Sequence, residues 1–151
     1  MSKKEWGNIT WILFHTLACK IKDDSPVNIV NNVFSNIILI CNNLPCPYCR
    51  DHASSYLKKY KDIKINKKEQ LILFLFDFHN KVNNKLRKKI EIKEILDKYT
   101  KVNLNIVLST FKQIYNKKQT TKMMLSSFHI NLALKNFFIF MSNNKKYFID
   151  L

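Results

Sequence analysis

Residues 71–86 read Leu-Ile-Leu-Phe-Leu-Phe-Asp-Phe-His-Asn-Lys-Val-Asn-Asn-Lys-Leu and form the clearest helical pattern in the chain. Apolar side chains recur in this stretch at spacings of four, three, four and four: Leu71, Leu75, Phe78, Val82 and Leu86. This spacing places them on one face of a helix. A stripe of this length predicts a core helix against which the rest of the chain packs.

The remaining sequence predicts further helices and no strands. Residues 5–20 and 27–42 have apolar side chains at helical spacing, and these two helices should pack antiparallel. Leu44-Pro45 ends the second, and a third begins at Cys46-Pro47, where proline suits a first helical turn, and continues to Tyr60. A lysine-rich linker, 61–68, precedes the core helix. Further helices are expected at 91–99, 102–116 and 123–140.

The composition supports one all-α domain. The chain has 151 residues, of which 46% are hydrophobic and 13% aromatic, enough for one core. The single glycine, Gly7, excludes dinucleotide folds and P-loops, which need several glycines near phosphates. We expect no secretory signal, because His15 interrupts the apolar run near the N-terminus. Polar residues recur along 123–141, so we expect a packed helix there and no transmembrane span.

The formal net charge of +15 would suit a partner that carries phosphates, such as nucleic acid, an anionic membrane or a phosphorylated cofactor. The lysines are scattered through nearly every segment alongside many asparagines, which indicates a general compositional bias. We therefore do not expect nucleic-acid binding from the charge alone.

Cys46 and Cys49 form a C-x-x-C unit at a predicted helix N-terminus, where the helix dipole stabilises a thiolate. This spacing leaves redox exchange, metal binding and coincidence open. His52 could be a third zinc ligand, but no second pair supplies a fourth. Cys19 and Cys41 should lie roughly 20 Å apart in an antiparallel hairpin, too far to bond. We expect both to be buried apolar side chains, with a resolving role for Cys41 left open.

Two stripes could bind a flat ligand. Gly7, Trp11 and His15 recur every four residues on one helix face, although Trp11 could equally be a core residue. His79 and Asn83 are also four residues apart and border the apolar face of the core helix. Nearby Lys85 and Lys88 could contact a pyrophosphate or form a solvated face, and Asn80 lies beside them.

Three motifs follow one another along the chain: Trp6-Gly7 with Trp11 and Leu13-Phe14-His15; then Cys46-x-x-Cys49; then His79-Asn80-x-Val82-Asn83-x-x-Leu86-x-Lys88. Together they resemble the Erv/ALR family of FAD-linked sulfhydryl oxidases over about residues 4 to 100. The first motif differs slightly, because the family often has leucine where this chain has Phe14. The stretch from Leu44 to Leu57 most closely resembles members encoded by large DNA viruses.

The resemblance implies a four-helix bundle with a short fifth helix, non-covalent FAD, and frequently a homodimer. Residues 1–100 would be the FAD-binding sulfhydryl oxidase domain. Residues 101–151, which match no family known to us, would be a C-terminal helical extension packed on that domain or at an interface. The implied cofactor-binding residues are Trp6, Gly7, Trp11, His15, His79, Asn80, Val82, Asn83, Leu86 and Lys88.

The resemblance also implies the chemistry. Cys46 and Cys49 would be catalytic: substrate thiols attack Cys46, and Cys49 passes electrons to FAD and then to oxygen, giving hydrogen peroxide. No cysteine follows Cys49, so substrate dithiol proteins would reach Cys46 directly or through a thioredoxin-like carrier. A viral member would act in the host cytoplasm or the virion. The alternatives are a zinc-stabilised basic binding module using Cys46, Cys49 and His52, and a cofactor-free dithiol exchange protein.

Overall fold

The computed structural model describes residues 2–117 and 124–151, with side chains described from residue 127 onward in the second range. Within these residues the fold is helical, and the nearest feature to a strand is one isolated antiparallel bridge between Ile21 and Phe148. The helices are α1 (Lys3–Lys20), α2 (Val27–Cys41), α3 (Pro47–Lys58), α4 (Lys68–Lys85), α5 (Asp97–Thr100), α6 (Leu104–Tyr115) and α7 (Met124–Asn143), with short 3₁₀ turns η1 (Lys93–Leu96) and η3 (Lys145–Tyr147). The predicted all-α class is confirmed.

The sequence sets most of the helix ends. Ser2 and Glu5 form a reciprocal capping box at the start of α1, with hydrogen bonds of 2.9 and 3.2 Å. Pro26 precedes α2, and Cys46 is the N-cap of α3 with Pro47 as its first residue. At the end of α4 the chain turns through Arg87, whose φ of 55° is left-handed and stops the helix.

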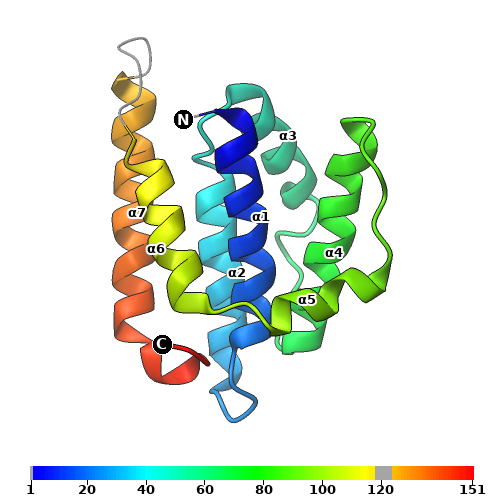
Figure 1. The fold of residues 1–151 in the computed structure, drawn as a ribbon, viewed down its shortest axis with the longest axis vertical. Coiled ribbons are helices and arrows are strands. Elements are labelled where there is room, and N and C mark those ends of the chain that lie inside the picture. The colour runs from blue at the N-terminus through cyan, green and yellow to red at the C-terminus, as the bar shows by residue number, and fades with distance from the viewer. Residues whose placement is uncertain (1, 118–123) are drawn as a thin grey trace.

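Helices α1 and α2 lie in the middle of the molecule and run antiparallel, as predicted (Figure 1). On one side α4 packs against α1 and α3 against α2; on the other side α6 packs along α1 and α7 against α2 (Figure 1). The short α5 contacts α1. This arrangement gives the central pair a neighbour on both sides.

The core includes side chains from the whole described chain. Leu71, Leu75 and Phe78 of the predicted stripe are almost fully buried. Phe111 of α6 and Phe137 of α7 are fully buried in the same cluster. Described residues after 101 therefore contribute to the same core as residues before it.

Four local expectations differ from the structure. Leu86 is 37% exposed, so its place in the buried stripe was wrong; α4 ends at Lys85 and the chain turns away. The helix predicted at 91–99 is a 3₁₀ turn followed by the single turn of α5. The helix predicted at 123–140 runs over Met124–Asn143, and Met123 lies outside the described residues. Cys41 is buried as predicted, whereas Cys19 is only half-buried.

The described helices include none that is both long enough and apolar enough to cross a bilayer. Helix α7 contains most of the apolar stretch 123–141, and it packs against α2 and shares ring contacts with α6. Its role in this fold is to cover one side of the central pair.

Candidate active site

Cys46 and Cys49 are joined as a disulfide at the first turn of α3, with their Cα atoms 5.2 Å apart. Cys46 is the N-cap residue, and its Sγ accepts a hydrogen bond of 3.2 Å from the backbone N–H of Cys49. Helix N-terminal amides carry partial positive charge, so they stabilise a thiolate when the disulfide opens. The C-x-x-C unit thus forms the disulfide that its spacing allows.

Cys49 lines a cavity of about 660 Å³, whereas Cys46 does not. The walls come from the N-terminal half of α1, the ends of α2 and α4, and the first turns of α3. This volume is typical of pockets that hold a large organic ligand. The predicted cofactor residues that line it are Trp6, Gly7, Trp11, His79, Val82, Asn83, Leu86 and Lys88.

Gly7 leaves open space in this wall. A Cβ added at Gly7 would meet no atom within 4 Å, although the residue is inside α1. Glycine is unfavourable in a helix interior, so its presence at a cavity wall fits a position where a ligand approaches the backbone closely.

Trp11 and His79 stack face to face, with ring centroids 4.0 Å apart and planes 5° apart. His15 lies behind this pair: it is 3% exposed, does not line the cavity, and places its Nε2 3.0 Å from Nδ1 of His79. Tyr99 of α5 stacks on the far side of His15 at 4.6 Å. Four rings from three helices therefore support one corner of the cavity.

Both histidines are neutral at pH 7. Burial, followed by the nearby His79 and the charge of Lys98, lowers the pKa of His15 to about 3. Burial, followed by the charges of Lys98 and Lys88, lowers the pKa of His79 to about 4. The hydrogen bond between the rings then needs one donor and one acceptor.

The tautomers of His15 and His79 follow from the ring nitrogen of His15 that makes no hydrogen bond. Its buried Nδ1 has no hydrogen-bond partner. A buried unpaired N–H is costly, so the favoured tautomer has His15 donating from Nε2 to Nδ1 of His79. His79 then carries its proton on Nε2, which gives the ring that lines the cavity a donor to offer a ligand.

Asn80 does not line the cavity. Its side-chain amide donates to the backbone oxygen of Glu91 at 2.9 Å and accepts from the backbone N–H of Glu91 at 3.0 Å. The backbone N–H of Lys88 also bonds to the oxygen of Asn83 at 2.8 Å. These bonds fold the segment after α4 back, and this brings Lys88 to the cavity wall.

The sequence patterns missed other residues of the wall. Lys3 belongs to the stripe of Gly7 and Trp11, one turn earlier, so extending that stripe would have found it. Tyr48 lies between the two cysteines, and Nζ of Lys85 sits 4.9 Å from its ring centroid. The lining also includes Lys4, Asn8, Thr10, Phe14, Cys41, Leu44, His52, Ala53 and Phe78, together with Lys85, which the sequence had already marked as a possible pyrophosphate contact.

The wall is electropositive. Its described lining residues include Lys3, Lys4, Lys85 and Lys88 and no carboxylate. Two lining side chains are held in their neutral forms. Burial raises the pKa of the Cys41 thiol, and partial burial with the charge of Lys85 lowers the pKa of the half-buried His52. An anionic ligand group fits this surface.

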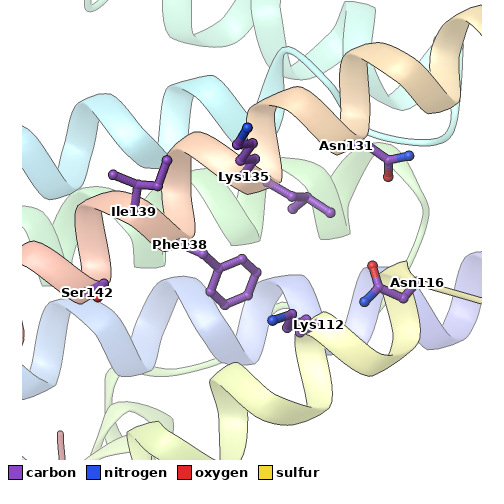
Figure 2. Close-up of a pocket in the computed structure, with 8 residues that line it drawn as sticks. Lys112, Asn116, Asn131, Lys135, Phe138, Ile139 and Ser142 are labelled. Atoms are coloured by element: carbon purple, nitrogen blue, oxygen red, sulfur yellow. The ribbon is translucent and has the colours of Figure 1, made fainter.

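A second hollow of about 500 Å³ lies between α6 and α7 (Figure 2). Lys112, Lys135, Asn116 and Asn131 contribute to its lining, and none of the predicted site residues does. We therefore place the candidate site in the cavity beside Cys49.

The zinc alternative gains no support from the geometry. Within residues 2–117 and 124–151, no three side chains of histidine, cysteine, aspartate or glutamate are grouped so that they could hold a metal ion. Two of its three proposed ligands, Cys46 and Cys49, are tied to each other.

The family model described as Erv1 / Alr matches residues 8–103 of this chain. The chain belongs to the Erv1/Alr family. The resemblance seen in the three motifs is thus confirmed. The Erv1/Alr segment contains the disulfide and most of the cavity wall, and it ends just before α6.

Relatives within the Erv1/Alr family include viral and cellular proteins. A protein of Invertebrate iridescent virus 3 is 33% identical over 101 residues, which covers 64% of this chain and 66% of the viral protein. The FAD-linked sulfhydryl oxidase of African swine fever virus is 36% identical over 85 residues, covering 56% of this chain and 71% of its own length. The FAD-linked sulfhydryl oxidase ERV2 of Saccharomyces cerevisiae is 30% identical over 98 residues, which covers 64% of this chain and 50% of the yeast protein.

Proposed function

We propose that this protein is a FAD-dependent thiol oxidase, which makes disulfides in substrate proteins and passes electrons through Cys46, Cys49 and FAD to oxygen, giving hydrogen peroxide. The observation that carries the proposal is the position of Cys49: it is half of a disulfide and part of the wall of an aromatic, electropositive cavity. The printed names of the African swine fever virus and yeast relatives support the same activity.

The cavity fits the cofactor in three respects. Stacked Trp11 and His79 present flat faces suited to an adenine or a flavin ring. The lysines at its wall suit a pyrophosphate, and Lys88 is held there by the folded-back segment. Gly7 leaves room for close approach. We assign cofactor binding to Trp6, Gly7, Trp11, His79, Val82, Asn83, Leu86 and Lys88, with His15 and Asn80 acting indirectly.

The two indirect residues have distinct tasks. His15 fixes the ring orientation and tautomer of His79 through the 3.0 Å contact between their nitrogens. Asn80 holds Glu91 and thereby the segment that carries Lys88. His15 and Asn80 therefore support residues that contact the cofactor and do not contact it themselves.

The chain's own chemistry is thiol–disulfide exchange. A substrate thiolate attacks Sγ of Cys46; a bond forms between substrate and Cys46, the Cys46–Cys49 bond breaks, and Cys49 leaves as a thiolate. The second substrate thiolate then attacks the substrate sulfur and releases Cys46 as a thiolate. The substrate is oxidised by two electrons and the cysteine pair is reduced by two. FAD, when bound, supplies the two-electron acceptor that reoxidises the pair and reduces oxygen to hydrogen peroxide.

The geometry assigns different sides to the two cysteines. Cys46 is half-buried and outside the cavity, so an incoming protein thiol can approach it without entering the cofactor space. Cys49 faces the cavity, where electrons must leave. The N–H of Cys49 already bonds to Sγ of Cys46, and this contact will stabilise the Cys46 thiolate on release.

The partners are also part of the proposal. Dithiol proteins are the substrates, directly or through a thioredoxin-like carrier, and the viral relatives favour action in the host cytoplasm or the virion. We also propose a homodimer, for which sedimentation velocity should give twice the chain mass of 18.0 kDa. Because α6 packs along α1, we regard residues 1–100 and 101–151 as one unit.

The experiment is oxygen consumption with dithiothreitol by protein that carries FAD. Cys49→Ser should keep the flavin absorption and lose turnover, because the cavity remains but the electron path is cut. Cys19→Ser is the matched control, since Cys19 is a free thiol outside the cavity and its loss should leave turnover intact. Full turnover in Cys49→Ser would refute the assigned role.

A further inference from the structure

Helix α6 lies outside the residues that match the family, but its last turn reaches the back of the cavity wall. Tyr115 is 3% exposed, and its hydroxyl lies 2.7 Å from Oγ1 of Thr10. Thr10 lines the cavity. A residue of the C-terminal region therefore touches a side chain of the proposed cofactor site.

The direction of this hydrogen bond can be assigned. Oγ1 of Thr10 also lies 2.6 Å from the backbone oxygen of Trp6, to which it donates its proton. A threonine hydroxyl has one proton, so Tyr115 must donate to Thr10. The result is a chain of two hydrogen bonds from Tyr115 through Thr10 to Trp6, and bonds in such chains strengthen one another.

This chain braces the turn of α1 that forms the wall. Trp6, Gly7, Thr10 and Trp11 all face the cavity from that turn and the next. On the cavity side Gly7 has no neighbour to hold it. The support of this turn therefore comes from behind, where α6 packs along α1.

A second contact holds the same end of α1. Nζ of Lys117, just after α6, lies 2.8 Å from a carboxylate oxygen of Glu5. Glu5 also closes the capping box with Ser2. The pair is exposed and contributes little by itself, but it aligns the end of α6 with the first turn of α1.

The donor role of Tyr115 persists over the working pH range. Burial raises the pKa of its hydroxyl, the hydrogen bond with Thr10 lowers it, and the nearby Cys41 raises it; burial is the largest of these effects, so the phenol stays protonated.

We propose that Tyr115 is a positioning residue for the cofactor site: by donating to Thr10 it holds the Trp6–Thr10 turn of α1 in the shape that binds FAD. The inference rests on the proposed function and extends it, because it makes α6 part of the cofactor site. It also gives the region after residue 101 a role in binding.

The test is FAD binding to flavin-free protein, measured by quenching of FAD fluorescence. Tyr115→Phe removes only the donor, and the dissociation constant for FAD should rise about fivefold, the range expected for one buried hydrogen bond. Thr10→Val should raise the dissociation constant by a similar factor. Thr10→Ser keeps the hydroxyl and should bind FAD as tightly as the unmodified protein. The double variant Tyr115→Phe/Thr10→Val should bind no more weakly than either single variant.

Phe148→Leu separates positioning from general stability. Phe148 is fully buried in the same C-terminal region but pairs with Ile21 at the other end of α1. The Phe148→Leu substitution should lower the melting temperature and leave the affinity for FAD unchanged. An unchanged affinity in Tyr115→Phe, or full additivity in the double variant, overturns the inference. Failure of the unmodified protein to bind FAD instead overturns the proposed function.

Discussion

Replacing Gly7 should change stability and cofactor affinity in opposite directions. Glycine inside a helix costs roughly 0.5–1 kcal/mol relative to alanine, and a Cβ at Gly7 would meet no atom within 4 Å. Gly7→Ala should therefore stabilise the flavin-free protein by about 0.5–1 kcal/mol. For a chain of this length the melting temperature should rise by about 1–4 °C.

The same methyl group occupies space at the cavity wall, so FAD should bind more weakly. If the dissociation constant for FAD rises tenfold, excess FAD stabilises the protein by about 1.4 kcal/mol less. The gain in melting temperature should thus disappear or reverse when FAD is added. Gly7→Leu, with a larger side chain in the same place, should weaken binding further.

Calorimetry of flavin-free and FAD-saturated protein measures both effects. Ser109→Ala is the control, because Ser109 is exposed on α6 and away from the cavity; it should raise the melting temperature slightly and equally in both states. If Gly7→Leu binds FAD as tightly as the unmodified protein, the cofactor does not occupy this cavity and the assignment of the wall is wrong.

Three further predictions concern the supports of the site and the fold. The folded-state pKa of His15 is about 3, below its ordinary 6.5, so the unfolded chain binds the proton at a higher pH than the folded chain does. The unfolding free energy of the flavin-free protein should therefore fall as the pH decreases from about 6.5 towards 3. His15→Gln should reduce this fall, as measured by urea titrations at several pH values. Asp150→Asn should cost about 2 kcal/mol in urea unfolding, because it leaves the buried Lys20 ammonium without the carboxylate 2.9 Å away; no loss would mean that this pair is not formed. Asn80→Ala should speed amide hydrogen exchange at Glu91, since both of their hydrogen bonds are lost; unchanged exchange would show that the segment is held by other contacts.

Local patterns were sufficient for much of the fold. The spacing of Leu71, Leu75 and Phe78 depends only on helix geometry, and all three are buried. Pro47 after Cys46 marks the start of α3 for a similar reason, because proline lacks an N–H that the first turn does not need. Features set within one or two helical turns can be predicted from sequence.

Features that depend on distant contacts could not be predicted in this way. Leu86 leaves the buried stripe because the chain turns at Arg87, which adopts a left-handed conformation without being glycine. Asn80 looks like a ligand-binding amide in sequence, but the turn places Glu91 against it. Nothing in the spacing of α6 indicates that Tyr115 would meet Thr10, which is 105 residues earlier.

The most direct test of the account is the absorption of bound flavin when a dithiol is added without oxygen. The purified protein, saturated with FAD, should lose its flavin absorption on mixing with dithiothreitol, and Cys49→Ser should keep its absorption under the same conditions. A folded protein that refuses FAD, or a Cys49→Ser variant that loses its absorption as fast as the unmodified protein, would contradict the claim that Cys49 delivers electrons to a flavin in this cavity.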